Sequence, residues 1–184
     1  MQTTLDLGSL KSVTKVIEEL GFNARRELKV AVSKTAKQVR IKSARKLRTV
    51  LNAPVKVLKR AIVGGRTTNE GLSAEVILRG GYKIPLKYFG ARQTKKGMAY
   101  KISPSNRGVI PGAFKVTRYE NNVYQRISKQ RGPVKQEKGP SPGEVYESAG
   151  VTTTALETAR EQLPKQIQER IRFLTIKAQG KLKT

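Results

Sequence analysis

The sequence predicts an α+β fold in which helical segments flank a central antiparallel sheet of about five short strands. Two features support this prediction. Apolar residues recur every three or four positions in the first 63 residues and again after residue 152, which is the helical period. Between residues 72 and 127 they alternate with polar residues, which is the strand period. A long loop rich in Gly and Pro then precedes a C-terminal amphipathic helix.

The length of 184 residues suits one domain with a sizeable core. The chain has no Cys and no His, so it lacks thiol chemistry, the commonest general base and the commonest metal ligand. We therefore expect no catalytic residue, no cofactor and no metal site, and a protein that is not an enzyme. The predicted single domain, 1–184, consists of a helical basic region (1–63), an antiparallel sheet (72–127), an extended loop (128–143) and a C-terminal helical region (144–184).

Charge is the strongest compositional signal. Lys and Arg number 38 against 13 acidic residues, which gives a net charge of +25. The net charge is +11 in residues 1–70, +12 in residues 71–140 and only +2 in residues 141–184. Such an excess repels itself in the folded state and favours a polyanion or an acidic protein surface as the partner. The N-terminus lacks the pattern of a signal peptide, and no apolar run reaches membrane-spanning length, so no membrane contact is expected.

Two helical patterns open the chain. Ser9 is the predicted N-cap of the first, which runs to Gly21. The second runs from about residue 24 to residue 48, and Gly21 leaves open whether the two form one interrupted helix. A short helix follows Pro54, which suits a first helical turn, and is expected to stop at Gly64-Gly65. The predicted apolar face of the second helix comprises Leu28, Ala31, Val32, Thr35, Val39 and Leu47.

The polar side of these helices is strongly basic. Residues three and four apart are neighbours on a helix, so the cations form a stripe with almost no acidic partner for i,i+4 pairing. Two interpretations stay open: a solvated helix face, or contact with DNA phosphates or an acidic partner. The candidate contact residues are Lys34, Lys37, Arg40, Lys42, Arg45, Lys46, Arg48, Lys56, Lys59 and Arg60.

Five short apolar runs, joined by turns of hairpin length, predict an antiparallel sheet or a small barrel with helices packed on one side. Aromatic residues are few and scattered, so no stacking surface for bases is evident, and Tyr88, Phe89, Tyr100 and Phe114 are expected in the core or on a sheet face. The segment 90–97 is predicted to be a basic hairpin loop. The predicted strands are centred on residues 72–78, 84–89, 98–102, 114–116 and 123–127.

The loop 128–143 contains three prolines and three glycines, and is predicted to be a docking arm rather than a catalytic loop. Candidate subunit or partner contacts on it and on the preceding hairpin are Arg126, Arg131, Pro133 and Lys135.

After a predicted break at Gly150, a C-terminal helix is expected, with a kink or break at Pro164. Its predicted apolar face comprises Leu156, Leu163, Ile167, Ile171, Leu174 and Ala178. That face is expected to pack either on the chain's own sheet or on a neighbouring subunit.

The order of several short motifs resembles the phage minor tail protein Z family, the tail completion proteins of lambda-like long-tailed phages and prophages. The likeness extends from about residue 20 to residue 175 and is densest between residues 84 and 146. Gln125 between Tyr and Arg, and Val134 in place of the usual Ile, depart mildly from the family pattern. The motifs are Ile84-Pro-Leu-Lys-Tyr-Phe-Gly-Ala-Arg, Lys95-Lys-Gly-Met-Ala-Tyr-Lys-Ile, Gly112-Ala-Phe, Val123-Tyr-Gln-Arg, Arg131-Gly-Pro-Val and Gly139-Pro-Ser.

The resemblance implies a non-catalytic virion protein of the tail and neck, assembled in the host cytoplasm. It further implies a homo-oligomer, expected to be a hexameric ring around the DNA channel, that contacts tail terminator and head–tail connector proteins. Genomic double-stranded DNA is a further expected partner. The alternative is a cellular nucleic-acid-binding protein similar to a ribosomal protein, which would share the charge and the lack of Cys.

Overall fold

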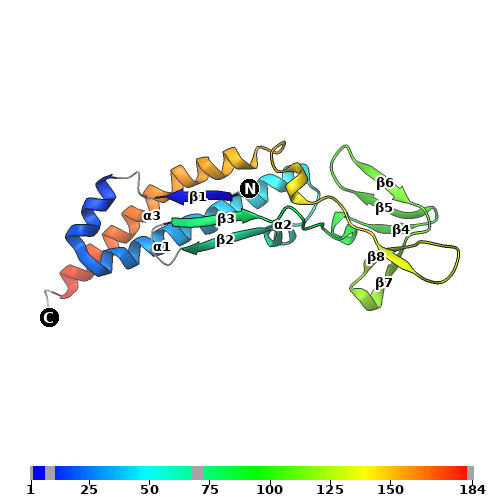
Figure 1. Ribbon diagram of the computed structural model, residues 1–184, viewed down its shortest axis with the longest axis horizontal. Coiled ribbons are helices and arrows are strands. Elements are labelled where there is room, and N and C mark those ends of the chain that lie inside the picture. The colour runs from blue at the N-terminus through cyan, green and yellow to red at the C-terminus, as the bar shows by residue number, and fades with distance from the viewer. Residues whose placement is uncertain (1, 7–10, 68–72, 182–184) are drawn as a thin grey trace. The chain divides into compact units, whose positions relative to one another are not determined.

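The computed structural model describes residues 2–6, 11–67 and 73–181, with side chains for residues 25–64 and 73–176 (Figure 1). The chain forms two compact units, each assembled from separate stretches. Unit 1 consists of Met1–Ser43, Ile62–Leu78 and Thr152–Thr184, and unit 2 consists of Ala44–Ala61 and Arg79–Val151. Three of the four regions expected from the sequence are divided between the units, whereas the loop 128–143 lies wholly in unit 2. The α+β class itself is confirmed: an N-terminal helix, antiparallel sheets of short strands and a C-terminal helix.

A single helix, α1 (Lys11–Val50), replaces the two N-terminal helical patterns and passes through Gly21 without a break. Its predicted apolar face is confirmed, because all six residues from Leu28 to Leu47 are buried. The one hydroxyl on this face is satisfied: Thr35 Oγ1 donates a hydrogen bond to the Ala31 carbonyl at 2.9 Å, the usual solution for Thr inside a helix. Ser9, the predicted N-cap, lies outside the described residues.

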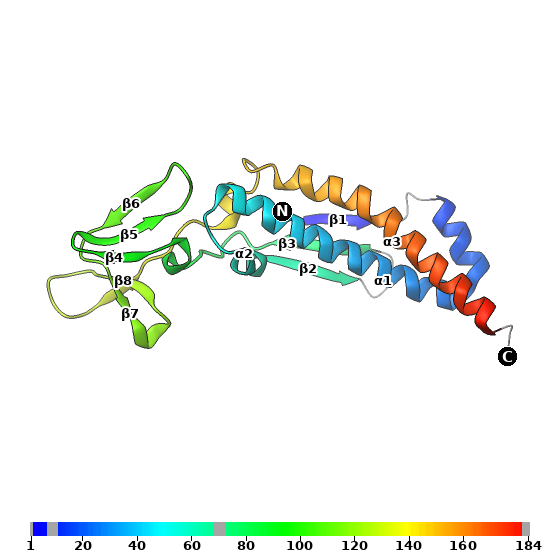
Figure 2. The ribbon, with the colours of Figure 1, turned by 180° about the vertical axis from the view of Figure 1, so that it is seen from behind.

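Unit 1 contains an antiparallel sheet of β1 (Gln2–Asp6), β2 (Ile62–Thr67) and β3 (Ser73–Leu78) in the order β1-β3-β2. The predicted alternation in β3 is confirmed, since Ala74, Val76 and Leu78 are buried. β1 and β2 were not predicted. Figures 1 and 2 together show α1 and the C-terminal helix on one side of this sheet. The apolar faces of the two helices therefore pack against the sheet and form the core of unit 1.

The expected helix stop at Gly64-Gly65 is wrong. The short helix α2 (Val55–Ala61) ends three residues earlier and continues directly into β2. Gly64 lies inside that strand, where its register against β3 is irregular. Its φ is +151°, and a Cβ there would collide with the Glu75 carbonyl oxygen and come within 2.7 Å of Val76 Cα. Gly64 therefore allows β2 and β3 to approach each other closely and does not form a turn.

The C-terminal helix α3 (Val151–Lys181) is continuous through Pro164, so the expected break does not occur. Leu163 and Ile167 are buried as predicted, Ile171 and Leu174 are only half-buried, and the side chain of Ala178 lies outside the described ones. Leu156 is 40% exposed, because Ala155 and Ala159 occupy the packed positions of that turn. The Arg170 guanidinium donates to Glu27 Oε2 on α1 at 3.4 Å. These contacts place α3 beside α1 on its own sheet, which is the first of the two arrangements expected from the sequence.

Unit 2 contains α2 and two further antiparallel sheets. One consists of β4 (Arg92–Thr94), β5 (Gly97–Lys101) and β6 (Arg107–Ile110) in that order. The other consists of β7 (Phe114–Val116), β8 (Asn122–Arg126) and β9 (Val134–Gln136). The described residues therefore hold three sheets of three strands, and the expected single sheet of about five strands is wrong in this respect. The predicted strands near residues 98–102, 114–116 and 123–127 are confirmed.

Two segments of unit 2 differ from prediction. The expected strand at residues 84–89 contains instead a 3-10 helix, η1 (Leu86–Phe89), which buries Leu86 and Phe89 at the i,i+3 spacing of that helix. The expected extended loop 128–143 contains β9 and part of another 3-10 helix, η3 (Pro142–Val145). Gly139 in this segment lies against the Phe89 ring, and a Cβ there would collide with it. The segment thus packs against the rest of unit 2.

Two leucines of α3 offer a test of this packing. Leu163→Ala should destabilise the protein by about 2–4 kcal/mol, because it deletes buried methyl groups and leaves a cavity. Leu156→Ala removes the same atoms from a side chain that is 40% exposed, against 8% for Leu163, and should cost less than about 1 kcal/mol. Urea denaturation followed by circular dichroism measures both. Equal losses would contradict the assignment of Leu163 to the core and Leu156 to the surface.

Candidate nucleic-acid and partner-binding surfaces

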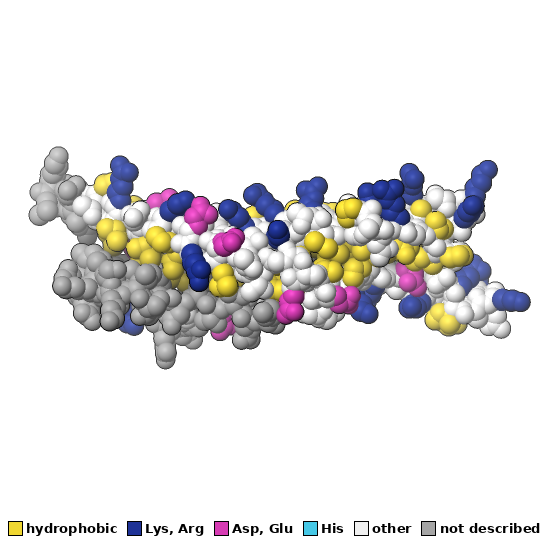
Figure 3. All heavy atoms as spheres, turned by 90° about the horizontal axis from the view of Figure 1, so that it is seen from above, with side chains coloured by type: hydrophobic (Ala, Val, Ile, Leu, Met, Phe, Trp, Pro, Cys, Tyr) yellow, Lys and Arg dark blue, Asp and Glu magenta, His cyan; other side chains and the backbone are white. Residues whose placement is uncertain are grey.

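Positive charge is concentrated in unit 2. That unit contains 21 Lys and Arg side chains against 4 Glu, a net charge of +17, whereas unit 1 contains 17 against 9, a net charge of +8. No acidic residue occurs between Glu75 and Glu120. Figure 3 shows that Lys and Arg side chains outnumber acidic ones on the face in view. Unit 2 is therefore the part of the chain that an anionic partner would attract most strongly.

The basic stripe predicted on the helices is divided between the two units. Lys34, Lys37, Arg40 and Lys42 belong to unit 1, whereas Arg45, Lys46, Arg48, Lys56, Lys59 and Arg60 belong to unit 2. Most of these side chains are exposed, as a contact surface requires; Lys34, Arg40 and Lys59 are half-buried. Two of them act on acids of their own unit. The pKa of Glu161 is lowered mainly by a hydrogen bond from Lys165, with a smaller contribution from the charge of Lys42. The pKa of Glu120 is lowered mainly by a hydrogen bond from Lys87, with a smaller contribution from the charge of Arg60. Part of this charge is therefore already compensated within the protein.

A lysine–glutamate contact fixes one turn of unit 2. Lys87, on η1, is only 13% exposed, and its Nζ donates to Glu120 Oε2 at 2.9 Å and to the Glu120 carbonyl at 3.0 Å. Glu120 and Asn121 have left-handed backbone, with φ of 52° and 58°. Such a conformation is unfavourable for a non-glycine residue unless its surroundings hold it. The hydrogen bond from Lys87, then the charge of Lys87, hold the pKa of Glu120 below its usual range.

Three aromatic residues and an arginine gather on the β7–β8–β9 sheet. Phe114 and Tyr124 are partners in register, and the Tyr119 ring lies 6.0 Å from that of Tyr124 at an angle of 58°. The Arg126 guanidinium lies 5.8 Å from the centre of the Phe114 ring. Scattered in the sequence, these side chains meet in the fold and form what we call the aromatic–arginine cluster. Partly exposed aromatic rings and Arg are the groups that carry most binding energy in interfaces.

The four predicted partner-contact residues do not form one cluster. Arg126 on β8 faces the side of the sheet that carries its register partner, Val134, whereas alternation places Lys135 on the opposite side. Lys135 Nζ lies 3.7 Å from Glu137 Oε1. Arg131 and Pro133 are exposed in the connection between β8 and β9, where the Ile127 N–H donates to the Pro133 carbonyl at 3.2 Å. Only Arg126 joins the aromatic–arginine cluster.

No arrangement of metal ligands is found in the part of the chain whose side chains are described: no three His, Cys, Asp or Glu residues come together there. In the same part of the chain, neither long helix has a window apolar enough to cross a membrane.

Comparisons of the chain with models of known protein families, with curated proteins and with solved structures found no match.

The Lys87–Glu120 contact predicts a measurable titration. Lys87→Gln should raise the pKa of Glu120, because it removes both the hydrogen bond and the charge that favour the carboxylate. A group with a depressed pKa stabilises the folded state above its unfolded-state pKa, and this contribution is lost as pH falls through the folded-state value. NMR titration of the Glu120 carboxyl carbon measures the shift. Lys83→Gln, which removes an exposed lysine of the same unit, is the control and should leave the pKa of Glu120 nearly unchanged.

Proposed function

We propose that this protein is a structural component of a phage virion, a tail completion or neck protein at the head-proximal end of the tail. In this role it forms a homo-oligomeric ring around the DNA channel, for which six subunits are the expected number. It contributes to head–tail joining and to positioning of the genome end, and it carries out no chemical reaction. Its partners are tail terminator and head–tail connector proteins and genomic double-stranded DNA.

The observation that carries this proposal is the charge of unit 2, +17 on 91 residues. A compact unit with so much unbalanced charge is destabilised by its own repulsion, and an anionic partner removes that cost. A ring repeats the charge of each subunit around its axis, which suits a channel that holds DNA. Each phosphate neutralised by the ring would release a counterion, so binding would weaken steeply with salt.

The motifs that resemble the tail completion family meet in unit 2, which further supports the proposal. The Gly139 N–H donates to the Ile84 carbonyl at 2.7 Å, and the Leu86 N–H donates to the Glu137 carbonyl at 3.2 Å. The Glu137 N–H in turn donates to the Val123 carbonyl at 2.9 Å. The first two bonds join segments that lie more than 50 residues apart in the sequence, and the third joins the same C-terminal segment to β8. Three of the motif-bearing segments are therefore hydrogen-bonded to one another.

The aromatic–arginine cluster supplies a subunit or partner contact in this proposal. It contains exposed Tyr119 and Arg126, and exposed Val134 lies opposite Arg126 on β9. Rings form when one patch of each subunit binds a different patch of its neighbour, and the contact repeats until the circle closes. Tyr and Arg at the centre of such a patch typically contribute most of the binding energy.

A cellular nucleic-acid-binding protein stays the second candidate, and one feature of the structure favours it. The aromatic–arginine cluster presents aromatic rings beside a cation, which is the arrangement on which unpaired bases stack. Such a protein would bind single-stranded RNA tightly and would not assemble with itself.

The solution mass of the protein tests the main proposal. We expect a ring-sized species by light scattering, either for the protein alone or on tail tubes of the phage that encodes it. High salt should preserve a ring held by apolar contacts, because screening weakens mainly exposed charge interactions. A protein that stays monomeric at moderate and high salt, ignores the tubes and binds single-stranded RNA would overturn the proposal in favour of the second candidate.

Two exposed valines test the role of the aromatic–arginine cluster in assembly. Val134 and Val109 are 45% and 46% exposed and both lie in strands of unit 2, but Val134 belongs to the cluster's sheet face and Val109 to the other sheet. Val134→Ser should weaken subunit association at least tenfold, a loss of about 1.4 kcal/mol. Val109→Ser should change it less than about twofold. Sedimentation velocity measures both, and equal effects would remove the cluster from the subunit contact.

A further inference from the structure

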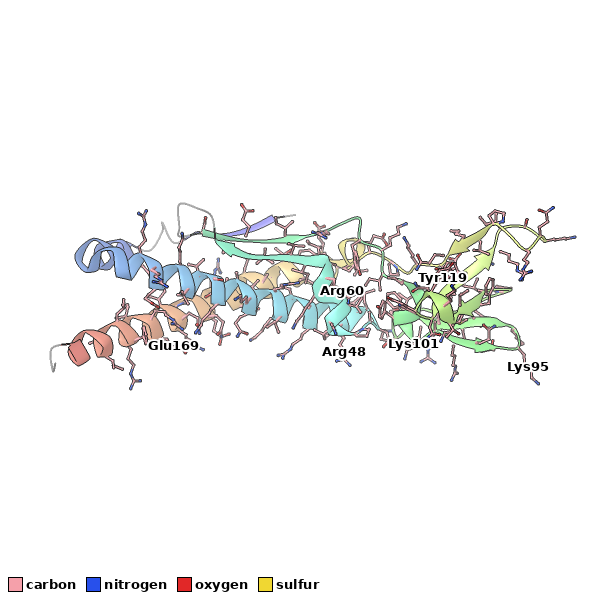
Figure 4. All side chains as sticks on the ribbon, turned by 90° about the horizontal axis from the view of Figure 1, so that it is seen from below. Arg48, Arg60, Lys95, Lys101, Tyr119 and Glu169 are labelled. Carbon is pink, nitrogen blue, oxygen red and sulfur yellow. The ribbon has the colours of Figure 1, made fainter. Side chains whose placement is uncertain are left out.

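The β4–β5–β6 sheet has one face that is occupied by cations. Strand alternation places Arg92 and Ala99, which are register partners, on the same face as Val109. The next row of that face consists of Lys101 and its register partner, Arg107. We call Arg92, Lys101 and Arg107 the cationic face. Figure 4 labels Lys101 at one end of β5 and Lys95 in the turn at the other end, so the sheet is flanked by further positive charge.

The opposite face of the same sheet is packed. Met98 is fully buried, and Tyr100 lies against Gly108, where a Cβ would come within 2.6 Å of the tyrosine Oη. The cationic face is therefore the outward one, and Arg92, Arg107 and Val109 are exposed on it. Its neutral members, Ala99 and Val109, are short, so a partner can approach the sheet closely between the cations.

The cationic face is unfavourable for the isolated protein. Lys101 and Arg107 are directly opposite each other on adjacent strands, and like charges in that position destabilise a sheet. No member of the face forms an ion pair within the part of the chain whose side chains are described. The sequence offers no nearby acid in these strands either, because residues 76–119 contain none. An external anion is the group that would relieve this repulsion.

The position of the cationic face is fixed by the backbone around it. The Asn52 N–H donates to the Ile102 carbonyl at 2.7 Å, and the Asn52 side-chain amide donates to the Lys101 carbonyl at 3.1 Å. The turn between β5 and β6 is closed by an Asn106 N–H that donates to Ser103 Oγ at 3.0 Å. Because the backbone that carries these cations is held in place, only their side chains lose freedom when they bind a partner.

We propose that the cationic face binds the phosphodiester backbone of nucleic acid, independently of base sequence. The rows of the face are spaced about 7 Å apart along the strands and adjacent strands about 4.8 Å apart, so one ligand must present several anions within about 10 Å. A nucleic acid strand carries one charge for each 3.4 Å of its axis, roughly, and meets that condition. The face itself has no aromatic side chain for stacking on bases and no acid to repel phosphate.

This inference deepens the proposed function, on which it rests only for the identity of the nucleic acid. It moves the principal DNA contact from the predicted helical stripe to a sheet of unit 2. The shared chemistry is the phosphate backbone, which both duplex and single-stranded DNA present. The number of phosphates contacted distinguishes the site from general attraction by the net charge, because it appears as the slope of affinity against salt.

The test is fluorescence anisotropy with a labelled duplex and a single strand of random sequence, using the full-length protein between about 50 and 200 mM salt. The variant is Arg92→Gln/Lys101→Gln/Arg107→Gln. The matched control is Lys83→Gln/Arg118→Gln/Lys129→Gln, which removes three exposed cations of the same unit that lie off the face. Poly-glutamate is the competing ligand and represents an acidic protein surface.

The face variant should lose about 2–3 units of the slope of log affinity against log salt for duplex DNA, since each phosphate contact contributes about 0.9. For a single strand the expected loss of slope is about 2 units. The form of DNA, duplex or single strand, whose slope falls by the larger fraction of its wild-type value is the form that the face binds. At about 100 mM salt the affinity should fall at least tenfold, whereas the control should lose less than half as much slope. The melting temperature of the face variant should not fall, because the substitutions relieve like-charge repulsion.

Equal losses in the two variants would overturn the proposal, because total charge alone would then explain binding. An equal loss of poly-glutamate binding would overturn it in favour of an acidic protein. The solution mass separates this inference from the proposed function. If the wild-type protein forms no ring and yet only the face variant loses DNA affinity, the proposed function fails and the inference stands. If the ring forms and the two variants bind DNA equally, the inference fails and the proposed function stands.

Discussion

Electrostatic self-repulsion is the constraint on which the arrangement of unit 2 depends. With 21 cations and 4 carboxylates, the unit cannot pair its charges internally, so it must keep them apart and in water. Its stability comes from uncharged groups such as Phe89, Met98 and Val123, which are fully buried. Lys87, whose side chain is only 13% exposed, has a carboxylate and a carbonyl as partners. Cations elsewhere in the unit lie on strand surfaces, in turns and at helix exteriors.

The same charge protects the edges of the two sheets in unit 2. Edge strands present unpaired backbone groups that other chains can pair with, and short length and charged side chains prevent this. The edge strands β4, β7 and β9 are each three residues long, and they carry Arg92, Lys115 and Lys135 respectively. The fourth edge, β6, carries Arg107. Cations on all four edge strands thus hinder strand pairing between copies of the chain.

Sequence patterns predicted the elements whose burial has one clear period. The face of α1 from Leu28 to Leu47 and the alternation of β3 are of this kind. The strand predicted at residues 84–89 is wrong because Leu86 and Phe89 fit a 3-10 helix as well as the end of a strand. In addition, Pro85 has no N–H to donate to a sheet. β2 and β6 contain Gly and Arg where strands favour branched residues, so their pairing partners decide their structure. On α3 the buried positions of that turn are Ala155 and Ala159, whereas a search for large apolar residues at helical spacing selects Leu156.

The candidate sites depended on register, which no single-sequence pattern supplies. The basic residues of α1 and α2 were visible from the sequence because helical neighbours lie three or four positions apart. Lys101 and Arg107 oppose each other only because a turn of defined length separates β5 from β6. Phe114, Tyr119 and Tyr124 meet only because β7 and β8 are joined by a turn with left-handed residues.

The division of the chain into discontinuous units has a consequence for its synthesis on the ribosome. All the residues of unit 2 have been polymerised once Val151 is added, whereas unit 1 still lacks its last segment. Until that segment is translated, unit 1 lacks the C-terminal helix, whose Ala155, Ala159 and Leu163 are buried, as are Val32 and Val39 of the first helix. A nonsense codon late in the gene would therefore release a chain that contains every residue of the basic unit 2 but lacks the C-terminal helix of unit 1. Apolar residues of the first helix would then be exposed to water, and such a surface favours aggregation.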